Sequence, residues 1–150
     1  MLNRQRWFGL CLLALAAAPA FAQSPAPVGR LKVASGAAFV VRAGTSMAAE
    51  AGQPVFETDS LKTGADGKLG VTLQYDTRVS IGANSEVRIA SFLYSPSDGK
   101  LALALKFLQG AAIYVSGRIA KLAPDAVRLE TPAAILGVRG TTLAIEVGAQ

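Results

Sequence analysis

Histidine is absent from this chain and cysteine nearly so, which removes the side chains that most enzymes and metal sites use. The sequence has no histidine and a single cysteine, Cys11, inside an apolar stretch near the N-terminus. Histidine is the commonest metal ligand and the usual general base. The enzyme class that remains open is a hydrolase that uses two carboxylates, and its candidate residues would be Glu57 and Asp59. We expect no enzyme, no metal, no cofactor and no disulfide in the exported protein.

The first 22 residues have the composition of a secretory signal. Arg4 and Arg6 precede an unbroken apolar run, Phe8–Ala18, and the small residues of Ala20-Phe21-Ala22 follow. A membrane-spanning helix needs roughly 20 apolar residues, so the length of this run disfavours the alternative of an uncleaved anchor. We predict a helical, cleavable signal peptide at 1–22, no transmembrane span after its removal, and a periplasmic or secreted location.

The charged residues are scattered singly rather than in blocks. The formal net charge is +5, and removal of Arg4 and Arg6 would lower it to +3. A nucleic-acid-binding protein normally carries a clustered basic stripe. We therefore expect no nucleic-acid partner, and the length after cleavage suits one domain.

Short runs of alternating apolar residues predict an all-β domain at 28–147, after a flexible lead at 23–27. Leu69–Tyr75 alternates strictly, and Leu101–Leu108 keeps a period of two despite its helix-favouring composition. Two runs within Gly29–Arg42 predict a hairpin or a solenoid corner. No segment has a helical apolar stripe. About ten short strands with frequent turns leave a sandwich, a barrel and a solenoid open.

Gly, Asp and Asn residues punctuate these strands in a recognisable order. The most specific segment runs from Thr131-Pro132 to Arg139-Gly140-Thr141. The looser marks are Asp59-Ser60-Leu61-Lys62-Thr63-Gly64, Asp66-Gly67-Lys68-Leu69, Asn84-Ser85-Glu86-Val87, Leu108-Gln109-Gly110 and Val115-Ser116-Gly117. From about Val28 to Val147 the chain resembles the FecR-type domain, the periplasmic sensing part of cell-surface signalling regulators. The resemblance implies a twisted, solenoid-like all-β unit.

The chain departs from the FecR-type regulators at two places. Those of iron uptake carry a cytoplasmic sigma-factor-binding segment and a membrane helix before this domain, whereas here a signal-like segment precedes it. We therefore expect no direct control of a sigma factor. In addition, Asp76-Thr77-Arg78 stands where the family commonly has Asp-Gly-Ser, so we expect an altered turn after the strand that ends at Tyr75.

Candidate site residues come from the same motifs: Asp59, Thr131, Pro132, Arg139, Gly140 and Thr141. Arg139, between two glycines, could offer its fork of donors to a carboxylate or sugar ligand. The structural interpretation, which we favour, pairs Arg139 with an acid such as Asp59.

Two functions remain open. The first is a non-catalytic sensing or binding module for an envelope protein, in which the closing strand Leu143–Val147 could add to a partner sheet. The alternative is a structural, cell-wall or glycan-binding envelope protein. Four aromatic residues could form an exposed platform for a glycan or a peptide, although core packing is their commoner use: Phe92, Tyr94, Phe107 and Tyr114.

Overall fold

The computed structural model describes residues 19–20, 24–138 and 142–148, and these form an all-β domain. The strands are β1 (Gly29–Ser35), β2 (Ala38–Arg42), β3 (Thr45–Ala48), β4 (Pro54–Val55), β5 (Ser60–Thr63), β6 (Lys68–Leu73), β7 (Arg78–Ile81), β8 (Glu86–Ser95), β9 (Lys100–Val115), β10 (Val127–Glu130), β11 (Ile135–Gly137) and β12 (Thr142–Val147). A short helix, α1 (Arg118–Leu122), follows β9. The predicted all-β class is confirmed.

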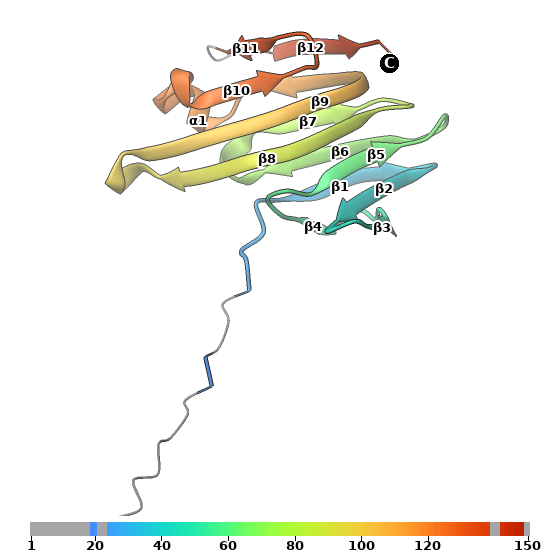
Figure 1. The fold of residues 1–150 in the computed structure, drawn as a ribbon, viewed down its shortest axis with the longest axis horizontal. Helices are drawn as coiled ribbons and strands as arrows, with labels where there is room; N and C mark the ends of the chain where they lie inside the picture. Colours follow the sequence, from blue (N-terminus) through green and yellow to red (C-terminus); the bar gives the residue numbers. More distant parts are fainter. Residues whose placement is uncertain (1–18, 21–23, 139–141, 149–150) are drawn as a thin grey trace, which may run out of the picture.

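One long curled sheet folds over into two layers that share strand β9. Layer A has the order β4-β1-β6-β7-β9-β12 and layer B the order β3-β2-β5-β8-β9-β10-β11. Every pair among the described strands is antiparallel except β10 with β9. Figure 1 shows β9 running the length of the molecule between the two ends of the sheet.

The core lies between the two layers. Strands β6 and β7 alternate buried and exposed residues, as a sheet with one solvated face does. The largest fully buried side chains come from both layers, among them Leu31, Leu61, Phe107 and Tyr114. Because a single cluster of buried apolar residues joins both layers, the domain has one core.

Gly110 is where β9 passes from layer B to layer A. Residues 100–109 pair with β8, and residues 110–115 pair with β12. Gly110 has φ +82°, and a Cβ there would overlap the Ser85 hydroxyl and lie 2.6 Å from the Asn84 carbonyl oxygen. Ser85 is buried, and its Oγ donates to the Ala83 carbonyl and accepts from the Ala111 N–H at 3.0 Å. The bend in β9 is therefore packed directly on the turn that precedes β8.

Several sequence expectations can be compared with these strands. Leu101–Leu108 is a strand, as predicted, and lies within β9. The predicted strand at Leu69–Tyr75 is wrong at its end: β6 stops at Leu73, and Tyr75 lies in a turn with φ +64°. Helix α1 was not predicted, because five residues are too few to show an apolar stripe.

The predicted hairpin within Gly29–Arg42 is also corrected. β1 pairs with β6 and β4 in layer A, whereas β2 pairs with β3 and β5 in layer B. The Gly36 turn therefore carries the chain from one layer to the other. The alternative expectation of a corner describes this turn.

Substitution of Gly110 tests whether the bend depends on a missing side chain. Gly110→Ala should lower the free energy of unfolding by about 3 kcal/mol, because left-handed backbone costs alanine about 1–2 kcal/mol and the new methyl group overlaps Ser85. Gly99→Ala is the matched control: Gly99 also has positive φ, but its Cβ would meet no atom within 4 Å. The control should cost about 1 kcal/mol in urea unfolding, and equal losses in both variants would contradict the packing argument.

Candidate functional site

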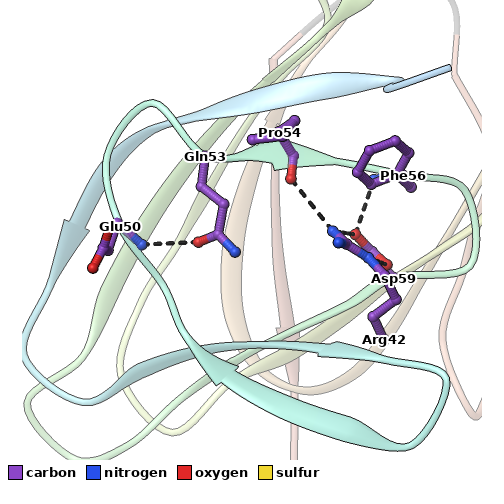
Figure 2. A network of polar contacts seen from close by, with 6 residues as sticks. All are labelled: Arg42, Glu50, Gln53, Pro54, Phe56 and Asp59. Atoms are coloured by element: carbon purple, nitrogen blue, oxygen red, sulfur yellow. Dashed lines mark hydrogen bonds and ion pairs between the residues drawn. The ribbon is translucent and has the colours of Figure 1, made fainter.

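Asp59, the first residue of the motif Asp59–Gly64, forms an ion pair with Arg42. The Asp59 side chain is fully buried, and that of Arg42 is 37% exposed. Arg42 Nε donates to Asp59 Oδ1 at 2.9 Å and Arg42 Nη2 to Oδ2 at 2.8 Å, a bidentate arrangement. The Phe56 N–H also donates to Oδ2. Figure 2 shows the guanidinium between Asp59 and the Pro54 carbonyl, to which Nη2 also donates.

This ion pair joins β2 to the loop that leads into β5. The guanidinium carbon lies 4.4 Å from the centre of the Phe56 ring, within cation–π range. The hydrogen bond to Asp59 raises the pKa of Arg42 above its usual value, although desolvation opposes it. The Asp59 backbone accepts from the Ile89 N–H, which ties the loop to β8. With both carboxylate oxygens engaged and no exposed surface, Asp59 can contact no substrate.

Thr131 and Pro132 make the turn between β10 and β11. The Thr131 N–H donates to the Ala134 carbonyl at 2.8 Å, and Thr131 Oγ1 accepts from the Ala134 N–H at 3.1 Å. Pro132 is exposed in this turn. Ser60, Arg88, Lys106 and Glu130 are successive cross-strand partners on four neighbouring strands. Asp59 precedes Ser60 and Thr131 follows Glu130, so three strand spacings, about 14 Å, separate the two. The two are not brought together.

Arg139, Gly140 and Thr141 lie outside the described residues. The predicted pairing of Arg139 with an acid therefore stays a prediction. Asp59, the acid suggested for it, has Arg42 as its partner.

Other acidic residues of the sequence shape turns and strand contacts. The Asp66 carboxylate accepts the Ala37 N–H, and Asp98 accepts from the Ser95 hydroxyl. Glu57 Oε2 accepts from the Phe92 N–H at 3.1 Å. Within the described ranges no three His, Cys, Asp or Glu residues come together as metal ligands.

The outer face of layer A carries a row without charge across five strands, here called the central row. Cross-strand register aligns Val33, Gly70, Ser80, Ile113 and Ala144. Val33 is 53% exposed and Ile113 47% exposed. Apolar surface that continues from strand to strand is a common property of surfaces that bind other molecules.

Charged side chains flank the central row, and most of them are basic. Arg30 and Arg78 lie on one side, in register with Thr72. Lys68 and Glu146 lie on the other side and line an open depression of about 450 Å³ that includes Ile113. The layer A face therefore combines an apolar centre with a mainly cationic rim.

The outer face of layer B has a different character. Cross-strand ion pairs join Lys62 to Glu86 and Lys106 to Glu130, each at 3.7 Å. Alternating, self-paired charges of this kind suit a solvated surface and are worth little for stability. The two faces of the domain therefore differ in kind.

The sequence could not reveal the central row. Its members come from strands far apart in the chain, and β1 reaches this register only through a bulge between Leu31 and Val33. Alternation does indicate that Ile113 faces opposite to Ala112 and Tyr114, but it cannot say which strands lie beside it.

Fold and surface together define a small two-layer β domain in which the described motif residues Asp59, Asp66 and Thr131 hold loops and turns in place. The sequence profile of a family described as FecR protein matches residues 59–150. The chain therefore belongs to the FecR family, a non-enzymatic family of signalling-related regulator domains. No curated protein and no solved structure gave a match. Within the described residues no helix is long and apolar enough to cross a membrane.

The Arg42–Asp59 pair makes an asymmetric prediction. Arg42→Met leaves a fully buried carboxylate without its cation and should cost about 3 kcal/mol in urea unfolding. Asp59→Asn keeps an acceptor for the Phe56 N–H and leaves a cation that water partly reaches, so about 1–2 kcal/mol is expected. If Asp59→Asn lowered the free energy of unfolding more than Arg42→Met does, the unpaired buried carboxylate would not be the main cost of breaking the ion pair.

Proposed function

We propose that this protein is a non-catalytic sensing module that engages a protein partner at the cell envelope through the outer face of layer A. The observation that carries the proposal is the central row, an uncharged strip across five strands with two half-exposed aliphatic side chains. On the layer B face, by contrast, the exposed apolar side chains Phe39 and Ile135 lie in register with ion-paired charges. An envelope location is supported by the signal-like order of residues 1–22.

The chemistry of the rim indicates the partner. Arg30, Lys68 and Arg78 surround the apolar centre, with Glu146 as the acid among these flanking residues. Protein interfaces typically combine an apolar core with a polar rim, and complementary charge sets orientation and association rate. A matching partner would present an aliphatic ridge flanked by carboxylates.

Strand β12 extends this surface to the edge of the sheet. Among the described strands it pairs with β9 alone, and addition of a strand to the edge of a sheet is a recurring mode of peptide recognition. This arrangement supports the expectation that the closing strand adds to a partner sheet.

A cell-wall or glycan-binding role is the second candidate. Its support is the pair Phe92 and Tyr94, which are half-buried on β8 rather than in the core. Co-sedimentation with purified cell wall tests this role directly.

Matched surface variants test the proposed face. Ile113→Asp and Arg78→Glu alter the layer A face, while Leu108→Asp changes an exposed residue of the same strand on layer B. In pull-downs from envelope extract, a stoichiometric partner should be retained by the wild type and by Leu108→Asp. Ile113→Asp should reduce its binding at least tenfold, about the 1.4 kcal/mol of a modest interface residue.

The proposal fails if Ile113→Asp and Leu108→Asp retain the partner equally while both stay folded by circular dichroism. Equal loss in both variants would also contradict it, since a specific docking face must distinguish the two layers.

A further inference from the structure

A cleft lined by aromatic rings lies between the start of β1, the turn after β6 and the end of β8. The Tyr75 and Tyr94 rings stack with centroids 3.3 Å apart and planes 20° from parallel. Phe92 and Leu93 also line the cleft, and Leu93 is 46% exposed. Its open volume is about 390 Å³. Two of the four aromatics predicted as a platform, Phe92 and Tyr94, are here, whereas Phe107 and Tyr114 are buried in the core.

The backbone that presents Tyr75 is strained. Tyr75 has φ +64° and the next residue, Asp76, has φ +70°. A left-handed conformation costs an L-residue roughly 1–2 kcal/mol and is unusual for a bulky side chain. Such strain concentrates at sites where a side chain must be held in one position. Here it holds the Tyr75 ring against Tyr94.

The cleft offers several hydrogen-bond acceptors, one of them charged, beside the hydroxyl groups of Tyr75 and Tyr94. The Glu57 carboxylate can only accept, and one of its oxygens already receives the Phe92 N–H. Gln74 donates one amide N–H to the Pro27 carbonyl at 2.6 Å, and its amide keeps a carbonyl oxygen that can accept and a second N–H that can donate. The described residues that line the cleft include no lysine or arginine. Negative ring faces add to this acceptor character.

We propose that this cleft binds an organic cation, an ammonium or guanidinium group, between the tyrosine pair and the Glu57 carboxylate. Aromatic faces attract cations, and the carboxylate supplies the opposite charge. A neutral ligand such as a sugar would make no use of the Glu57 charge, whereas a cation would be attracted by it. The cation could be a free amine or a lysine or arginine side chain of a peptide.

Small probes with matched neutral isosteres test the charge requirement. Choline is compared with 3,3-dimethylbutanol, and acetyl-Gly-Arg-Gly-amide with its citrulline counterpart, by NMR titration of the tyrosine ring signals of the full-length protein. Each cation should bind in the millimolar range and at least threefold more tightly than its isostere, as exposed cation–π contacts allow. Preference for the Arg peptide over choline would assign the cation to a protein partner, and the reverse to a free amine.

Two variants separate binding from folding. Glu57→Gln keeps the acceptor for the Phe92 N–H but removes the charge, and should weaken choline binding about threefold. Tyr75→Asn relieves the strained backbone, since asparagine adopts positive φ readily, and should remove most of the binding while the protein stays folded. Phe39→Ala and Glu50→Gln, at exposed positions outside the cleft, should leave binding unchanged.

Several results would overturn the proposal. These are equal binding of choline and its neutral isostere, no binding of any cation at about 50 mM, unchanged binding in folded Tyr75→Asn, or tighter binding of chitotriose than of either cation. None of them contradicts the proposed function, which the Ile113 variant tests, because the cleft and the depression around Ile113 share no lining residue.

Discussion

Strand β9 belongs to both layers, and the contact between Gly110 and Ser85 sets the place where it crosses from one to the other. Residues before Gly110 continue the β8 hairpin, and residues after it pair with β7 and β12 in layer A. Because the Ser85 hydroxyl also bonds the Ala111 backbone, the bend and the turn before β8 are one unit. The core between the layers and the alignment of the central row both depend on this crossing.

The described residues that carry the family resemblance also fix turns and loops against neighbouring strands. Gly117 packs on the turn before β7, where a Cβ would lie 2.6 Å from the Thr77 hydroxyl, and Asp59 clamps the loop before β5 through Arg42. Thr131 closes the turn after β10. These positions determine the frame and expose little surface. The binding proposed for this domain must therefore use the outward-facing side chains that these positions align.

Two surfaces of opposite character result from that alignment. The layer A face has an apolar centre with a mainly basic rim, and the tyrosine cleft has acceptors and a carboxylate. Both surfaces suit the binding role proposed for this domain, because binding requires only complementary shape and charge. The tyrosine cleft and the depression around Ile113 share no lining residue, and a groove lined by Pro27, Gln74 and Arg30 lies between the cleft and the rim of layer A.

Local alternation determined the all-β class, most strand positions and the inward or outward direction of residues such as Ile113 and Leu105. Turn chemistry determined the breaks at Gly64, Asp66 and Thr131-Pro132. Pairing was decided only by the tertiary structure: β1 joins β6 instead of β2, and Arg42 rather than a distant arginine meets Asp59. The central row and the tyrosine stack were decided there as well. The central row depends on the bulge before Val33, and the tyrosine stack depends on the positive φ of Tyr75. Both also depend on long-range register, and periodicity along the chain carries no information about which strands lie side by side.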